Sequence, residues 1–199
     1  EVAQMGRGAV SLRDATHADV PRLTELWGEL LRKGEPEQQA ADVVALVDGS
    51  ADAGESRVVV AELDGHVAGA VLLRVAPTTA INLEPAVHVV APHVYPELRR
   101  HGVGRALMEA AMQFAEERGI GYLRSGSLSM SREANRFLAR LGFGPLVMLR
   151  VGTTQTVRGR LDAAGATARR PSGHRQIAQV LATRRAQRRR QTSVGDAQG

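Results

Sequence analysis

The stretch that decides the fold is Val94-Tyr95-Pro96-Glu97-Leu98-Arg99-Arg100-His101-Gly102-Val103-Gly104-Arg105, which leads from a strand pattern into a helix pattern through a basic turn. Glycines let backbone N–H groups approach a ligand closely, and the N-terminus of a helix carries partial positive charge. Arginine adds bidentate donors for phosphate. The turn therefore predicts a pyrophosphate-binding site, although a plain strand-to-helix turn whose glycines ease packing gives the same pattern.

Hydrophobic patterning outside the turn predicts strands and helices that alternate along the chain. Strands are expected at residues 9–13, 57–63, 66–75, 86–94, 122–128 and 143–151. Helices are expected at residues 20–31, 36–47, 102–118 and 131–141. A hairpin at Asp64-Gly65 followed by a β-α-β unit indicates a mixed sheet, and hence an α/β or α+β sandwich.

The strand that enters the turn contains Pro92. Proline cannot donate a hydrogen bond to a neighbouring strand, so a regular central strand does not hold it. We therefore expect a β-bulge, or the end of pairing, at this position.

Composition and charge exclude several classes of protein. The chain has 199 residues and no cysteine, which excludes a disulfide framework, a thiolate zinc site and a cysteine nucleophile. No apolar run approaches the roughly 20 residues that span a bilayer, so no membrane partner is expected. The first ten residues lack the basic and apolar regions of a signal peptide, and we expect a cytoplasmic protein without a metal site.

The net charge of +5 divides unequally along the chain. Residues 1–149 hold 15 basic and 19 acidic side chains, whereas residues 150–199 hold eleven arginines and only two acidic residues. We expect a flexible N-terminus at 1–8, a folded domain at 9–151, and an Arg-rich linker, helix and disordered tail at 152–199. Such a tail could contact nucleic acid nonspecifically or an acidic protein surface, or it could simply be solvated.

The sequence resembles the GNAT superfamily of N-acetyltransferases. Arg99-Arg100-His101-Gly102-Val103-Gly104 is similar to the superfamily signature Arg/Gln-x-x-Gly-x-Gly/Ala, and Leu141-Gly142-Phe143 is similar to the end of a later helix in the family. The paired N-terminal helices and the hairpin occur in the family's order as well. The resemblance covers about residues 9–151 and implies a mixed sheet of about six to seven strands, flanked by about four helices and followed by a basic extension.

The resemblance implies acetyl-CoA as the cofactor and transfer of its acetyl group to an amine. In that fold two parallel strands separate at a bulge and the pantetheine arm lies between them, so the N–H of Val94 or Tyr95 would polarise the thioester carbonyl. The cofactor-binding residues implied are Val94, Tyr95, Arg99, Arg100, His101, Gly102, Val103, Gly104, Arg105, Ser131 and Asn135.

Acyl transfer to an ammonium requires a base, because only the neutral amine is nucleophilic. Glu84 and His88 lie on or beside the strand that leads to the turn, and His93 is one residue from the expected N–H donor. Each could equally be an ordinary loop or sheet residue.

The position that often carries a tyrosine acid in the family is Leu138 here. Tyr95, Tyr122 or a water would then protonate the leaving thiolate, or the thiolate would leave unassisted. A frequent asparagine is also replaced, by Ser131, and Asn135 lies one helical turn later.

Two hypotheses follow. The first is an N-acetyltransferase that acts on a small molecule, a protein lysine or a protein N-terminus by direct transfer in a ternary complex, with a dimer plausible. The second is a noncatalytic adaptor that senses acyl-CoA and binds nucleic acid or an acidic partner through its Arg-rich tail.

Overall fold

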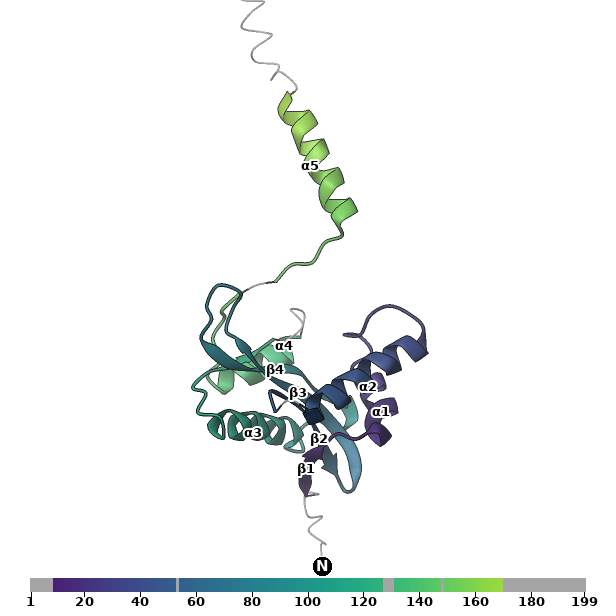
Figure 1. Ribbon diagram of the computed structural model, residues 1–199, viewed down its shortest axis with the longest axis vertical. Coiled ribbons are helices and arrows are strands. Elements are labelled where there is room, and N and C mark those ends of the chain that lie inside the picture. The colour runs from purple at the N-terminus through teal and green to yellow at the C-terminus, as the bar shows by residue number, and fades with distance from the viewer. Residues whose placement is uncertain (1–8, 53, 127–130, 148, 170–199) are drawn as a thin grey trace, which may run out of the picture. The chain divides into compact units, whose positions relative to one another are not determined.

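The computed structural model describes residues 9–52, 54–126, 131–147 and 149–169. The chain divides into two compact units, Glu1–Gly144 and Pro145–Gly199. The sheet and its four covering helices belong to the first unit (Figure 1). The expected N-terminal segment 1–8 and the Arg-rich tail from residue 170 lie outside the described residues.

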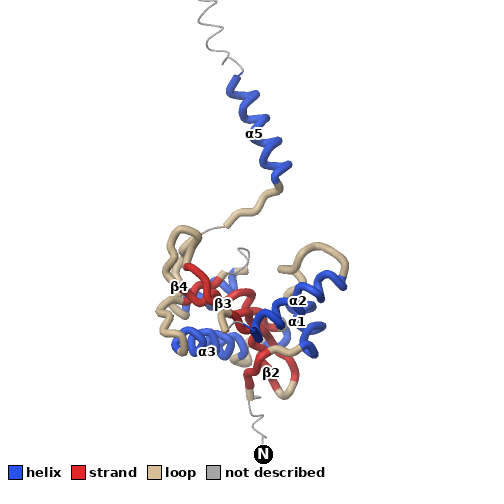
Figure 2. Tube along the Cα trace, viewed as in Figure 1, coloured by secondary structure: helices blue, strands red, loops and turns tan. Residues whose placement is uncertain are grey.

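The first unit contains one five-stranded sheet in the order β1-β2-β3-β4-β5. Figure 2 shows strands in red and helices in blue. Its strands are β1 Val10–Asp14, β2 Ser56–Leu63, β3 His66–Pro77, β4 Pro85–Val94 and β5 Leu123–Ser125. Its α-helices are α1 Val20–Leu26, α2 Pro36–Asp52, α3 Val103–Glu116 and α4 Arg132–Arg140, and 3-10 turns occur at His17–Asp19 and Pro96–Leu98. Strands β1 to β4 pair antiparallel, while β4 and β5 pair parallel. The mixed α/β architecture expected from the sequence is confirmed.

The expected count of six to seven strands is too high, since the described residues form five. Residues 143–147 and 149–151, where a last strand was expected, have no strand structure. Pro145 falls in this stretch and cannot donate to a strand ladder, and Gly144 before it adds conformational freedom. The hydrophobic side chains that suggested a strand, such as Leu149 and Val151, are exposed.

The two faces of the sheet carry separate apolar cores. Helices α3 and α4 cover one face, where Val71, Val89, Leu107 and Phe114 are buried. Helices α1 and α2 cover the other face; the buried residues there are Val20, Leu23, Trp27, Val43, Val47, Val58, Val60 and Ala70. In Figure 1 the two helix pairs lie on either side of the sheet. Residues that alternate along a strand therefore project toward different helix pairs.

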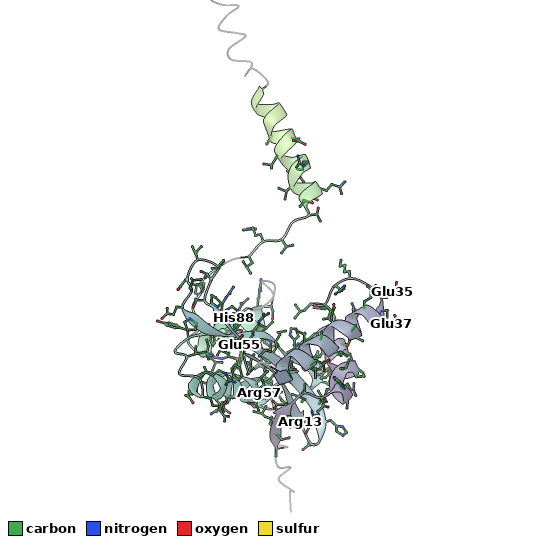
Figure 3. All side chains as sticks on the ribbon, in the orientation of Figure 1. Arg13, Glu35, Glu37, Glu55, Arg57 and His88 are labelled. Carbon is green, nitrogen blue, oxygen red and sulfur yellow. The ribbon has the colours of Figure 1, made fainter. Side chains whose placement is uncertain are left out.

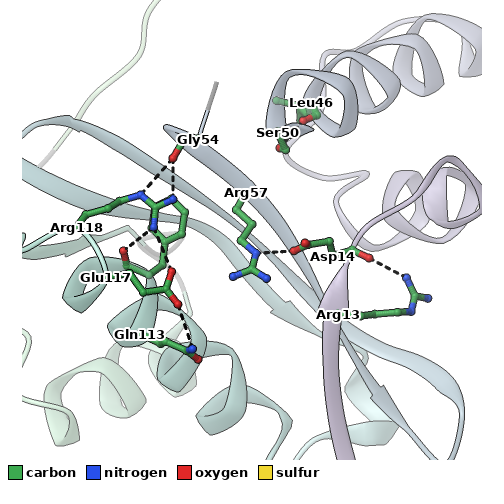
Figure 4. A network of polar contacts seen from close by, with 10 residues as sticks. Arg13, Asp14, Leu46, Ser50, Gly54, Arg57, Gln113, Glu117 and Arg118 are labelled. Atoms are coloured by element: carbon green, nitrogen blue, oxygen red, sulfur yellow. Dashed lines mark hydrogen bonds and ion pairs between the residues drawn. The ribbon is translucent and has the colours of Figure 1, made fainter. Parts of the chain in front are cut away.

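Polar contacts fix both ends of this sandwich. Arg118, which follows α3, donates from Nη2 to the carbonyl oxygen of Gly54 at 2.8 Å and lies over the Phe114 ring (Figure 4). Arg13 on β1 donates to both carboxylate oxygens of the buried Asp19, at 2.7 and 2.8 Å. The hydrogen bonds from Arg13 hold the pKa of Asp19 below its usual value. They therefore tie the first strand to the start of α1.

Strand β4 has a bulge at the position that Pro92 predicted. Leu72 pairs with Val90 and Ala70 pairs with His93, so β4 has one residue more than β3 across this interval. Ala91 has a φ of 48°, in the left-handed region. The prediction of a bulge is confirmed. The extra residue changes which backbone groups of β4 point toward β3.

The second unit contains the helix α5, Thr154–Arg169. Thr153 accepts a hydrogen bond from the N–H of Thr156 at 3.1 Å, as expected for a residue before a helix. The sequence predicted an Arg-rich linker and a helix within residues 152–199, and α5 spans 16 residues of this region.

Gly69 on β3 lies against the bulged part of β4. A Cβ atom at this position would be 2.6 Å from the carbonyl oxygen of His93 and 3.1 Å from Cγ1 of Val103. We expect Gly69→Ala to lower the free energy of unfolding by about 1 to 3 kcal/mol, because the backbone of β4 would have to move. Denaturant unfolding would measure the loss.

A matched control is Gly49→Ala in α2, where a Cβ atom meets nothing within 4 Å. This variant should be as stable as the wild type or more stable by up to about 1 kcal/mol, because alanine favours the helix. Equal effects at the two positions would contradict the close approach at Gly69.

Candidate functional site

The bulge sets the direction of the backbone groups at the end of β4. The N–H of Tyr95 donates to the carbonyl oxygen of Ala68 at 3.0 Å, toward β3. Because successive residues of a strand direct their N–H groups to opposite edges, the N–H of Val94 faces away from β3. Of the two N–H donors expected from the sequence, that of Tyr95 is thus occupied inside the sheet, and that of Val94 faces the other edge.

This edge of β4 is only partly covered by β5. The parallel pairing joins Val87–Val89 to Leu123–Ser125 and goes no further in the described residues. Beyond Val89 the strand continues to Val94 without a β5 partner in this part of the chain. Pro92 has no N–H group, so the N–H of Val94 is one of the few backbone donors at this edge of β4. An extended ligand with amide groups could pair with such an edge.

The turn after β4 ends at the N-terminus of α3, where the first backbone N–H groups are directed out of the helix. Gly102 precedes the helix with a φ of 90°, and Arg100 also has a positive φ, 67°. The first hydrogen bond of α3 runs from the N–H of Ala106 to the carbonyl oxygen of Gly102. The N–H groups of Val103, Gly104 and Arg105 precede it and are therefore directed out of the helix end, where an anion is stabilised. A Cβ atom at Gly102 would meet nothing within 4 Å, so the space before this helix end is open.

The basic side chains of the turn have defined partners. Arg99 and Arg100 both form ion pairs with Glu133 on α4, at 3.3 and 2.9 Å. Nδ1 of His101 lies 2.8 Å from the carbonyl oxygen of Arg99, and Arg105 pairs with Glu109 one turn along α3. Glu133 was missed by sequence reasoning, because it is more than thirty residues from the turn. Its position in the first turn of a predicted helix was the available signal.

The residues expected on α4 have mainly structural roles. Ser131 caps the helix, as its hydroxyl accepts a hydrogen bond from the N–H of Ala134 at 3.3 Å. Leu138 is buried in the core shared with α3, so no proton donor occupies its place. Asn135 is exposed and lies one turn after Ser131, to which its backbone N–H donates.

The candidate bases lie at different distances from the bulge. Glu84 is exposed in the loop before β4, and the ten residues between it and Tyr95 span about 30 Å at the usual strand rise. The structure therefore does not bring Glu84 to the site. His88, which is labelled in Figure 3, and His93 both belong to β4 itself. His88 pairs with Arg124, one residue before the pairing with β5 ends.

The imidazole of His88 is held in one orientation. Its Nε2 lies 2.9 Å from the carbonyl oxygen of Pro77, so Nε2 carries the proton in the neutral ring and Nδ1 keeps the lone pair. Burial lowers the pKa of His88, and nearby Arg124 and Arg74 lower it further against the opposing effect of the Pro77 bond. A histidine with a lowered pKa is neutral at pH 7 and can accept a proton.

His93 has a different environment. Its Nδ1 is buried and has no hydrogen-bond partner in the described structure. Buried polar atoms are nearly always bonded, so an unpartnered nitrogen beside the Val94 donor keeps His93 a second candidate base.

Tyr95 directs its hydroxyl group away from the turn, to α1. The hydroxyl donates to the carbonyl oxygen of Arg22 at 3.0 Å and lies 3.3 Å from a carboxylate oxygen of Glu25. Burial and the Glu25 carboxylate raise the pKa of Tyr95, so it stays protonated at neutral pH. Tyr95 lines a cavity of about 370 Å³ together with Glu25, Glu62, Glu97 and the two arginines Arg13 and Arg22. Arg13 pairs with Glu62 and Arg22 pairs with Glu25, so most of the charge in this cavity is balanced.

Trp27 links α1 to the bulge. The side chain is 3% exposed and belongs to the core between α1, α2 and the sheet. Its Nε1 also donates to the carbonyl oxygen of Ala91 at 3.0 Å, a contact that sequence reasoning did not foresee. The indole therefore holds the residue whose left-handed backbone creates the bulge.

Comparison with known proteins identifies the family of this chain. The model of the Acetyltransferase (GNAT) family matches residues 20–143. The chain belongs to the GNAT acetyltransferase family, as the turn, the bulge and the short parallel pairing of β4 with β5 already indicate. A comparison with curated proteins finds no match.

Solved structures of low sequence identity share the fold. A transcriptional regulator from Bacillus halodurans C-125 matches with a TM-score of 0.62 at 18% identity, over 73% of this chain and 100% of that one. An aminoglycoside N-acetyltransferase in complex with CoA matches with a TM-score of 0.62 at 16% identity, over 77% and 99%. Glucosamine-6-phosphate N-acetyltransferase from Arabidopsis thaliana matches with a TM-score of 0.56 at 17% identity, over 73% and 99%.

Two further features are absent from the described residues. No helix there has the length and apolarity that crossing a membrane requires. No group of three or more His, Asp or Glu side chains in the same residues is placed to hold a metal ion.

The contact between Trp27 and Ala91 leads to a prediction. We expect Trp27→Phe to lower the free energy of unfolding by about 1 to 2 kcal/mol, because it removes a buried hydrogen bond and part of a core side chain. The affinity for a ligand that binds along β4 should fall as well. Denaturant unfolding and ligand titration would measure both, and unchanged values in both would contradict a role of Trp27 at the bulge.

Proposed function

We propose that this protein is an N-acetyltransferase that moves the acetyl group of acetyl-CoA directly to an amine. The observation that carries the proposal is the edge of β4 beyond Val89, which has no strand partner in the described residues and leads to the N–H groups directed out of the start of α3. A pantetheine arm would extend along this edge, with the N–H of Val94 donating to one of its carbonyl groups. The pyrophosphate would then lie at the N–H groups of Val103, Gly104 and Arg105.

The proposed chemistry uses no covalent enzyme intermediate. A histidine of β4, either His93 or His88, would accept the proton of the acceptor ammonium directly or through bound waters, and the neutral amine would attack the thioester carbon. The C–N bond forms, the C–S bond breaks, and the second proton of the attacking nitrogen passes to the departing CoA thiolate or to solvent. The chain has no cysteine, so no acetyl-cysteine intermediate is available. The acceptor class stays open between small amines and protein amino groups.

A second candidate function is a noncatalytic acyl-CoA-sensing adaptor. The observation in its favour is Leu138, which is buried in the core where many relatives have the tyrosine acid. Tyr95, the nearest alternative acid, has its hydroxyl bonded to α1. A protein that binds CoA but releases none from acetyl-CoA with any of a panel of amines and peptides would favour this alternative.

Binding of CoA is tested most sharply at Gly102. Saturating CoA should raise the Tm of the wild type by about 5 to 10 °C, whereas Gly102→Glu should show no shift because it places a carboxylate where the pyrophosphate would lie. The matched control is Gly119→Glu at the opposite end of α3, which also has a positive φ and open space around it. Both variants share the backbone strain and the charge change, so only the position differs. A normal shift in Gly102→Glu would refute the pyrophosphate assignment.

The role of His88 is tested by the pH dependence of acetyl transfer. Because its pKa lies below the usual 6.5, kcat/KM should fall only as the pH drops below that value and the ring becomes protonated. We expect His88→Gln to lower kcat by about 100-fold or more and to remove this acidic limb. His93→Gln, the control on the same strand, should keep the limb. If the acidic limb of the pH profile persists in His88→Gln and disappears in His93→Gln, the base is His93 and not His88.

A further inference from the structure

Four arginines gather beside the proposed pyrophosphate site. Arg100 from the turn and Arg132, Arg136 and Arg140 from α4 line a cavity of about 460 Å³. The three arginines of α4 follow one another at a spacing of four residues, so they lie along one face of the helix. They are exposed, and this face is distinct from the one that buries Leu138.

The positive charge of this cavity is not balanced within the described structure. Its one lining carboxylate is Glu133, which already forms ion pairs with Arg99 and Arg100. No ion pair involves Arg132, Arg136 or Arg140 in the residues that the structure describes. Like charges one helical turn apart destabilise a helix. An anion bound between these arginines would therefore stabilise α4.

We propose that this cavity binds the 3′-phosphate of the CoA ribose. The inference rests on the proposed function, because the pyrophosphate at the turn would place the adenosine end of CoA beside Arg100. CoA carries a phosphomonoester on that ribose, and guanidinium groups suit its oxygens in charge and geometry. Glu133 holds Arg100 at the edge of the cavity, so both phosphate sites share one arginine.

The consequence concerns which acyl donors the protein accepts. Free acyl-CoA carries the 3′-phosphate, whereas dephospho-CoA and the phosphopantetheine group of acyl carrier proteins lack it. The arginines of α4 would therefore select free acyl-CoA as the donor. The pyrophosphate site alone would not distinguish CoA from dephospho-CoA.

The test compares the dissociation constants of CoA and dephospho-CoA by calorimetric titration of the full chain. The wild type should bind CoA about 10-fold or more tightly than dephospho-CoA, because the contacts are charged hydrogen bonds. In the double variant Arg136→Gln/Arg140→Gln this preference should fall to about 2-fold or less, with the affinity for dephospho-CoA unchanged. Both side chains are exposed, so the variant should fold. The control is Arg158→Gln/Arg160→Gln on α5, which makes the same change in charge elsewhere and should keep the preference.

The outcomes separate this inference from the proposed function. Equal affinity of the wild type for the two ligands would overturn the 3′-phosphate site while leaving CoA binding intact. A preference for CoA that survives in Arg136→Gln/Arg140→Gln, or is lost in the α5 control, would also overturn it. Failure of both ligands to bind the wild type would overturn the proposed function itself, and the inference with it.

Discussion

The site depends on one irregularity, the extra residue of β4 at Ala91 and Pro92. A regular strand would continue to pair on both sides, but the bulge turns the N–H of Val94 away from β3 and leaves it beyond the end of β5 pairing. Contacts on both faces of the sheet stabilise this bulge. Trp27 bonds the Ala91 carbonyl from the α1 side, and Gly69 permits the close approach of β3. The irregular strand is thus a well-supported part of the core.

Local signals in the sequence predicted most of this arrangement. Pro92 indicated the bulge because proline lacks a ladder donor, and the glycines of the turn indicated a helix start that can accept an anion. The Asp64-Gly65 hairpin was also correct. These features depend on a few neighbouring residues, so their physical cause can be read from the sequence.

Features that depend on distant partners could not be predicted. Nothing in the sequence shows that Glu133 meets two arginines of a turn more than thirty residues away, or that Tyr95 donates to α1. The choice between Val94 and Tyr95 as donor depended on the register of β3 against β4. The strand expected at 143–151 is absent from the described residues of that range. Its hydrophobic pattern suggested a strand, but Pro145 cannot donate to a strand ladder, and no described strand pairs with this stretch.

The bond between Trp27 and the bulge has a spectroscopic consequence. Trp27 is the single tryptophan of the chain, so its indole accounts for nearly all fluorescence excited at the red edge of protein absorption. Indole emission responds to hydrogen bonding at Nε1 and to the polarity around the ring, and here both are set by the carbonyl of Ala91 and the α1 core. The protein therefore contains its own optical probe of β4, without any label.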